Sequence, residues 1–342
     1  MRTLDLSDGA TSPPPYRLKL MLMPAFSFAG LGTILDSLFI VNWLAQEARF
    51  EWQLLGLEES VTASNGTPLA VESEWPAPHA LDEVWVLASF ATKRYRDDTR
   101  LAMWLRHCAA AGANLGGIEV GSDMLAAAGV MQGHRVAMHW DNREGFSERY
   151  PQLETSSELY CLDHDRLSCA GGTAIVDLMF AWLARHVEPP LLEELRNHLL
   201  ERRQRDGARQ QLAADPLHHI ETSAQIRRVL RHMRRHIETP LSTADLANHA
   251  GLSPRQLERR FKQELGVTPI RYYLWLRINR AHRLLQQTEL SVAAVASAAG
   301  FASLEHFSRS YRRFFGCAPS ADRLQSPEAP VLPLRYLPYR RR

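Results

Sequence analysis

The hydrophobic positions in the first half of the chain form short continuous runs that are separated by stretches with helical periodicity. The runs predict strands and the periodic stretches predict helices. In chain order, strands are predicted at 17–23, 52–57, 83–88, 114–118, 158–162 and 166–169, and helices at 31–46, 96–111, 122–128 and 173–185. A hairpin is predicted at 61–71, with its turn at Asn65-Gly66. Strands that alternate with helices favour a mostly parallel sheet covered on both faces, so we expect an α/β domain that is doubly wound and flavodoxin-like.

The second half of the chain carries one pattern of apolar and polar positions twice. The segments 242–269 and 291–319 coincide when Gly251 is laid on Gly300, with one additional residue in the turn of the second copy. Each copy predicts a short helix, a tight turn at the glycine and a longer helix whose apolar residues recur every four positions. A helix predicted at 270–287 joins the copies. We therefore expect an all-α domain with two helix-turn-helix units.

The outward positions of the two longer helices carry arginine and other hydrogen-bonding side chains. Arginine reads guanine edges, glutamine reads adenine, and both arginine and a helix N-terminus bind phosphate. The joining helix spans about 27 Å, close to the roughly 34 Å between successive major grooves. The candidate DNA-binding residues are Ser253, Arg255, Gln256, Arg259 and Arg260 in the first copy and Ser303, Glu305, His306, Arg309 and Arg313 in the second. The alternative, a helical bundle with an exposed basic face, would require neither the repeat nor these helix N-termini.

The charges are distributed unequally along the 342 residues. The net charge of +2 combines a part from Thr222 to Arg342, with 21 basic and 8 acidic residues, and a remainder with a balance of −11. A basic C-terminal part fits a polyanionic partner such as double-stranded DNA. The acidic part must have another role, which argues against a purely architectural DNA-binding protein.

Cysteine usage and the absence of targeting signals indicate a cytoplasmic protein. The four cysteines are far apart and show no metal-ligand spacing, so we expect reduced thiols and neither a metal nor a cofactor. No secretory signal is evident, and the apolar stretch 29–45 is interrupted by Asp36 and Asn42, so no membrane span is expected. Residues 1–16 and the Pro-rich, basic tail 326–342 are predicted to be disordered or mobile.

Residues 223–325 resemble the DNA-binding domain of AraC-type transcription regulators. The resemblance lies in the paired units, in the segment AGFASLEHFSRSYRRFFGCAP at 299–319, and in the pattern Arg277, Ala281, Leu284 and Leu285 on the joining helix. It implies a transcription regulator, usually an activator, that binds promoter half-sites, works with RNA polymerase and forms a homodimer.

A second resemblance is centred on the junction between the strand at 114–118 and the helix that follows it. The sequence Ile118-Glu119-Val120-Gly121 has the form of a nucleophile elbow, a sharp strand-to-helix turn that exposes one side chain beside helix N–H groups. With Leu125-Ala126, Gly129, Gly133, His139-Trp140, the segment 169–174 and Asp177, it resembles the class I glutamine amidotransferase-like (PfpI-type) domain. This domain precedes an AraC-type domain in GlxA-type regulators.

The elbow residue departs from the catalytic members of that family. Where they carry a cysteine nucleophile, this chain has Glu119, and neither Cys108 nor Cys169 falls at the elbow. A carboxylate cannot form the thioester intermediate, so we expect no enzymatic activity. The alternative is an amidotransferase-like hydrolase or amidase, fused to a DNA-binding domain, in which Glu119 acts as a general base.

A carboxylate in a partly apolar pocket favours a cationic partner. An ammonium group over an aromatic ring gains cation–π attraction, so we expect a small cationic or zwitterionic inducer, such as betaine, carnitine or a basic amino acid. The candidate ligand-binding residues are Glu119, His139, Trp140, Phe28, Trp43 and Asn142, with Asp36 and Asn42 as weaker candidates. In the alternative interpretation, Glu119 bonds only to protein groups and His139 is a packing residue.

These observations predict the organisation of the chain. Residues 17–189 form the amidotransferase-like ligand-sensing and dimerisation domain, residues 190–222 a linker helix and hinge, and residues 223–325 the DNA-binding domain. The linker is expected to be helical from 191 to about 216.

Overall fold

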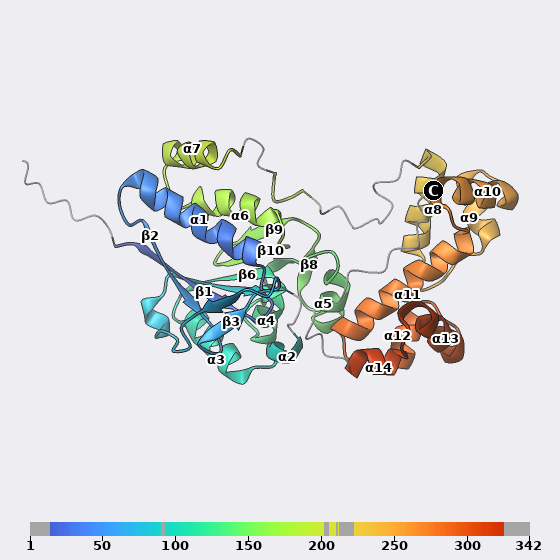
Figure 1. Cartoon of the computed structure of the whole chain (residues 1–342), viewed down its shortest axis with the longest axis horizontal. Coiled ribbons are helices and arrows are strands. Elements are labelled where there is room, and N and C mark those ends of the chain that lie inside the picture. The colour runs from blue at the N-terminus through green and yellow to red at the C-terminus, as the bar shows by residue number, and fades with distance from the viewer. Residues whose placement is uncertain (1–13, 90–92, 202–204, 210, 212–221, 325–342) are drawn as a thin grey trace, which may run out of the picture. The chain divides into compact units, whose positions relative to one another are not determined.

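The computed structural model describes residues 14–89, 93–201, 205–209, 211 and 222–324 (Figure 1). They form two compact units. The first comprises the described residues up to His134 together with Leu159–Arg209, and the second comprises Arg135–Glu158 together with the described residues from 211 onward. This grouping places residues 135–158 with the C-terminal helices, whereas the sequence pattern placed them in the sensing domain. Most of the predicted N-terminal segment and the basic tail lie outside the described residues.

The first unit is built on a six-stranded sheet, which confirms the predicted α/β class. The strand order is β2 (Phe50–Leu55), β1 (Tyr16–Leu22), β5 (Glu83–Ala88), β6 (Asn114–Glu119), β10 (Arg166–Cys169) and β9 (Tyr160–Asp163). All neighbouring pairs are parallel except β10 and β9, which pair antiparallel. The predicted hairpin is present as β3 (Ser60–Thr62) and β4 (Pro68–Ala70).

Helices cover both faces of this sheet (Figure 1). On one face, α1 (Phe28–Ala45) packs with α6 (Ala174–Leu183) and α7 (Pro189–His198). On the other face lie α3 (Thr99–Ala110) and α4 (Gly121–Ala127), preceded by the short α2 (Lys93–Arg96) and the 3₁₀ turn η1 (Pro78–Ala80). The helix predicted at 96–111 is therefore divided, because Asp98 caps α3 by accepting from the Leu101 amide at 2.8 Å.

Helix α1 is apolar and long enough to cross a membrane, by length and composition. In the fold it is a core helix, because Leu31, Ile34, Leu38 and Val41 are buried against the sheet and α6. Asn42 has a structural role here: its side chain accepts the Arg49 and Phe50 amides at 2.9 Å each.

The second unit contains the predicted repeat. Its helices are α8 (Ala224–Arg235), α9 (Thr243–Ala250), α10 (Pro254–Leu265), α11 (Pro269–Gln287), α12 (Val292–Ala298), α13 (Leu304–Phe315) and α14 (Pro319–Leu324). Gly251 and Gly300 adopt positive φ angles of 67° and 76° in the turns of the two units, as the sequence predicted. Each helix-turn-helix unit has its own apolar core, and α11 contributes side chains to both cores.

The predicted linker helix is shorter than expected. It ends at His198, and the described residues from Leu199 to 211 form no further helix. The charged run near 205 leaves the helical path because Arg205 is tied to α6: its amide donates to Asp177 Oδ1 at 2.6 Å and its Nε to Oδ2 at 2.8 Å. Asp177 is buried, so this ion pair holds the chain at Arg205 against α6.

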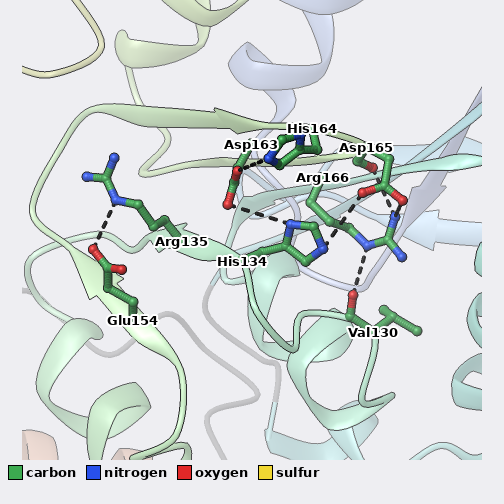
Figure 2. A network of polar contacts seen from close by, with 8 residues as sticks. All are labelled: Val130, His134, Arg135, Glu154, Asp163, His164, Asp165 and Arg166. Atoms are coloured by element: carbon green, nitrogen blue, oxygen red, sulfur yellow. Dashed lines mark hydrogen bonds and ion pairs between the residues drawn. The ribbon is translucent and has the colours of Figure 1, made fainter.

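The sequence pattern missed a short segment of the second unit, β7 (Arg135–Ala137), α5 (Arg143–Arg149) and β8 (Glu154–Ser156). Its first residue, Arg135, directly follows His134, which belongs to the polar network drawn in Figure 2. Within the first unit, buried Arg166 donates to the Val130 carbonyl at 2.8 Å and to Asp165 Oδ2 at 2.7 Å. These bonds join the turn after α4 to the turn between β9 and β10.

Candidate functional sites

Helix α10, the longer helix of the first helix-turn-helix unit, presents its N-terminus and one arginine-rich face to solvent. Ser253 accepts the Gln256 amide at 3.3 Å, and Gln256 Oε1 accepts the Ser253 amide at 2.8 Å. This capping box fixes the helix N-terminus and leaves Arg255 and Arg259 exposed. The predicted residue Arg260 differs from these two, because it is half-buried and its guanidinium donates to Gln225 of α8.

Helix α13, the longer helix of the second helix-turn-helix unit, also begins at a capping serine but has a different surface. Ser303 caps it by accepting the His306 amide at 3.3 Å. Glu305 and Arg309 form an exposed i,i+4 ion pair at 3.6 Å. Leu304, which is not among the residues predicted from the sequence, has a side chain that is 49% exposed at the first position of this helix. The sequence holds no signal for this exposure, because Leu304 and Phe307 are three positions apart and lie on neighbouring positions of one helix face.

A buried polar network holds α13 in place. His282 Nδ1 of α11 lies 2.8 Å from the Tyr311 hydroxyl and 3.0 Å from Asp322 Oδ2 of α14, and Tyr311 also donates to Asp322. Burial alone would raise the pKa of Asp322, but the hydrogen bonds from His282 and Tyr311 hold it below its ordinary value.

Arg277 gives the joining helix a specific function within the second unit. Its guanidinium donates to the carbonyls of Ala299 at 3.0 Å and Gly300 at 2.7 Å, and it lies 4.1 Å from the centroid of the Phe301 ring. The carbonyls at the end of α12 have no partner within their own helix, so Arg277 satisfies them. This contact fixes the turn between α12 and α13.

The elbow of the first unit has the geometry that its sequence predicted. Glu119 ends β6 with a positive φ of 57°, a strained conformation for a residue with a side chain. Its carboxyl group accepts a hydrogen bond from Ser89 and one from the Gly172 amide at 3.4 Å. Gly171 permits this approach, because a Cβ there would lie 2.7 Å from Glu119 Cδ.

The environment of Glu119 favours the neutral acid unless a cation is supplied. Burial raises the pKa of its carboxyl group, and the hydrogen bonds from Ser89 and Gly172 oppose that effect only in part. The thiols cannot replace a nucleophile at this position: burial raises the pKa of both Cys108 and Cys169 to about 12.

The structure does not bring all the predicted ligand-binding residues together. Phe28 and Trp43 occupy opposite ends of α1, about 22 Å apart along the helix axis. The Trp43 ring lies 5.2 Å from that of His198, at the far end from Phe28. A ligand small enough to pair with one carboxylate therefore reaches at most one of these two rings.

The remaining candidates, His139, Trp140 and Asn142, belong to the second unit. The rings of His139 and Trp140 lie 5.1 Å apart, and burial lowers the pKa of His139. Asn142 precedes α5 and its Oδ1 accepts Gln287 Nε2 at 3.0 Å. Asn142 is therefore already bonded to α11 within this unit.

A cavity of about 160 Å³ lies elsewhere in the first unit, at the amino ends of the strands. It is lined by Glu83, Arg166, Trp182 and His186, among others. The buried Glu83 carboxyl group accepts Tyr16, Trp85 and Trp182, at 2.9, 2.6 and 3.0 Å. Since neutral donors satisfy its oxygens, Glu83 has a structural role in the core. The cavity lies at the amino ends of the strands, whereas Glu119 lies at the carboxyl end of β6.

Comparisons with known proteins agree with this description. A family profile described as a helix-turn-helix domain matches residues 246–325. The chain is 36% identical to the HTH-type transcriptional regulator CdhR of Pseudomonas aeruginosa over 92% of each chain, and 33% identical to ArgR of the same species over 91% of this chain and 94% of that one. It is 29% identical to GlxA of Rhizobium meliloti over 91% of this chain and 96% of that one. A solved AraC family regulator from Pseudomonas putida is 30% identical, with a TM-score of 0.50, over 54% of this chain and 100% of that one.

An α/β domain followed by two helix-turn-helix units defines a DNA-binding transcription regulator. The relatives extend over nearly the whole chain and share this class. The chain belongs to the AraC-type transcription regulators that carry an N-terminal class I glutamine amidotransferase-like domain, the GlxA type. It is a regulator and not an enzyme, which sets aside the amidase interpretation of Glu119.

Proposed function

We propose that this regulator is a cytoplasmic homodimer that binds promoter half-sites and, when an inducer occupies its first domain, activates catabolic genes together with RNA polymerase. In this proposal residues 17–189 sense and dimerise, residues 190–222 form the hinge, and residues 223–325 bind DNA. The observation that carries the DNA-binding part is the pair of capped, solvent-facing helices α10 and α13 on one joining helix.

The exposed positions of the two helices support different contacts with DNA. Arg255 and Arg259 are exposed and can contact guanine or phosphate, whereas the Gln256 oxygen is engaged in its capping box. Arg309 is exposed too, but it must exchange its ion pair with Glu305 for a contact with DNA. Leu304 adds an apolar contact, because the thymine methyl group is the apolar feature of the major groove. Arg260 is assigned to the contact with α8 in place of a base.

The inducer is a small cationic or zwitterionic metabolite such as betaine, carnitine or a basic amino acid. Glu119 carries this part of the proposal, because its backbone is strained and its half-buried carboxyl group is hydrogen-bonded only to a hydroxyl and an amide in the described structure. A ligand ammonium would supply the missing positive charge. The inducer acts only by binding one arrangement of the regulator better than another.

Substitution of the recognition-helix arginines tests the DNA-binding assignment. We expect Arg259→Ala and Arg309→Ala each to weaken binding to the regulator's own upstream duplex by about 1–3 kcal/mol, measured by gel shift. The matched control is Arg185→Ala, which removes one exposed guanidinium from the first unit. If both recognition-helix variants kept wild-type affinity, the assigned helices would be wrong.

A further inference from the structure

The segment that follows His139 and Trp140 packs against the helix that joins the two helix-turn-helix units. Within the second unit, α5 contacts the C-terminal half of α11 (Figure 1). Glu144 forms an ion pair with Arg280 Nε. Gln287 Nε2 donates to the Asp141 carbonyl at 2.9 Å and to Asn142 Oδ1 at 3.0 Å. We name this contact between 141–145 and 280–287 the latch.

The latch is closely packed at its centre. Gly145 is buried in α5, and a Cβ at this position would lie 2.6 Å from Gln287 Cβ and 2.6 Å from Gln287 Oε1. Only glycine, which has no side chain, allows α5 and α11 to lie this close together at position 145. The backbone of Gly145 is not in the left-handed region, so helix geometry alone does not require glycine there. The glycine serves the contact.

At one end, the latch is continuous with the candidate ligand-binding residues. Asp141 and Asn142 directly follow His139 and Trp140 in the chain. The Trp140 amide donates to Gln211 Oε1 at 2.8 Å, and Gln211 Nε2 donates to the Met138 carbonyl at 2.8 Å. A movement of the Trp140 backbone is therefore transmitted to the first residues of the latch.

At the other end, the latch reaches both helix-turn-helix units through one side chain. Besides Glu144, Arg280 bonds to Glu238, which precedes α9, at 2.7 Å, and to the Ala298 carbonyl at the end of α12, at 2.8 Å. The Arg280 side chain is 16% exposed. Opening the latch leaves this buried guanidinium with fewer acidic partners, which alters the junction of α9, α11 and α12.

The charges of the latch give its expected effect a direction. Asp141 and Glu144 bring carboxylates to a helix whose Arg280 and Arg283 are basic, with Asp141 Oδ1 at 3.7 Å from Arg283 Nε. DNA affinity depends on positive potential at the protein surface, and carboxylates reduce it. The closed latch therefore neutralises part of the positive charge of α11.

We propose that the latch is an intramolecular inhibitory surface, in which α5 binds α11 and holds the inducer-free regulator in a state of low DNA affinity. Movement of the His139–Trp140 segment releases it. This inference rests on the proposed function and adds to it the contact through which the signal passes.

A wedge at the centre of the latch tests the proposal in the full-length chain. Gly145→Ala introduces the clashing Cβ, and alanine is the better helix former, so α5 itself remains stable. Without inducer, we expect the variant to bind the labelled upstream duplex about tenfold more tightly in fluorescence anisotropy. The amides of 143–149 should also exchange with deuterium faster than in the wild type, because their packing partner is displaced.

Three further measurements make the result decisive. Glu144→Lys opposes Arg280 without altering packing, and we expect the same direction of change. Glu148→Gln removes an exposed acid from the same helix and should leave affinity unchanged. Unchanged or weaker DNA binding by both Gly145→Ala and Glu144→Lys would overturn the latch. If wild type and variants all bound upstream and shuffled duplex equally, the proposed function would fail instead, and deuterium exchange at α5 would still decide whether the helices dock.

Discussion

Two acidic side chains, one in each unit, occupy opposite environments. Asp322 of the second unit is hydrogen-bonded to His282 and Tyr311, and its pKa is held below the ordinary value. Glu119 of the first unit has only Ser89 and a backbone amide, and burial raises its pKa. The described structure gives Asp322 the partners that a buried carboxylate needs, whereas Glu119 lacks a cationic one.

This difference separates a structural acid from one that is suited to a ligand. A carboxylate with satisfied partners stabilises the elements that carry those partners, here α11, α13 and α14. A half-buried carboxyl group without a cationic partner, such as that of Glu119, is stabilised when a cation binds beside it. The comparison predicts that substitution of Asp322 affects stability and that substitution of Glu119 affects ligand binding.

The largest effect is expected for Asp322→Ala. The change leaves the Tyr311 hydroxyl and the His282 ring without their buried acceptor, so we expect the α13 region to lose about 3 kcal/mol of stability. Deuterium exchange of residues 304–315 in the full chain measures this local opening. Exchange as slow as in the wild type would show that the network contributes little.

A smaller change in free energy is expected for Glu119→Gln, and it concerns inducer binding and not stability. The amide keeps the shape of the side chain and loses its negative charge. We expect affinity for a cationic amine inducer to fall by at least about tenfold, or about 1.4 kcal/mol, in calorimetry. Retained affinity would assign Glu119 to the alternative role, an acid that bonds only to protein groups. Thermal unfolding should be little changed, because no buried cation depends on Glu119 in the described structure.

Inducer affinity, which depends on Glu119, and the stability of α13, which depends on Asp322, should be lost at different pH values. A protonated Glu119 cannot pair with an ammonium group, so inducer affinity should fall as pH drops through its raised pKa, above the ordinary value of about 4.3. The stability that Asp322 contributes is present above the ordinary pKa of about 3.9 and is lost only as pH falls through its lower folded-state pKa. Calorimetry and α13 exchange across the same pH series check this order; loss of both at one pH would contradict it.

The smallest effect is expected for Asp245→Ala. Asp245 forms the capping box of α9 with Ser242, and it is exposed. Its removal should destabilise the first helix-turn-helix unit only slightly, because water competes for the hydrogen bonds of an exposed cap. Exchange of residues 243–250 provides the measurement, and a loss as large as that for Asp322→Ala would mean that exposure does not decide the importance of an acid here.

The sequence was sufficient for the elements whose period is long and regular. The helices around Gly251 and Gly300 and the buried strand β5 were all predicted, because each has a clear apolar face or run. The elbow was also predicted, because Ile118-Glu119-Val120-Gly121 stands between a predicted strand and a predicted helix and resembles the elbow of PfpI-type domains. Segments β7, α5 and β8 were missed because they are short and their polar residues satisfy tertiary contacts in place of a periodic face.

The errors at individual residues have tertiary causes as well. The linker helix was predicted too long because its charged run favours a helix locally, while Arg205 gains a buried partner in Asp177 of α6. Arg260 seemed equivalent to Arg259 along the chain, but α8, which the pattern did not predict, takes up its guanidinium. Leu304 was overlooked because an aliphatic residue three positions before the buried Phe307 is expected on the core side of the helix, and only the fold shows that it is exposed.

The most direct test of the account is one titration series on the full-length protein. Its affinity for the labelled upstream duplex is measured by anisotropy with and without betaine, carnitine and arginine, for the wild type and for Glu119→Gln. The account predicts that one of these amines changes wild-type affinity by about tenfold and that Glu119→Gln abolishes the response while retaining ligand-free affinity. If none of the amines altered DNA binding, or if the variant responded as the wild type does, the assignment of Glu119 as the sensing group would be contradicted.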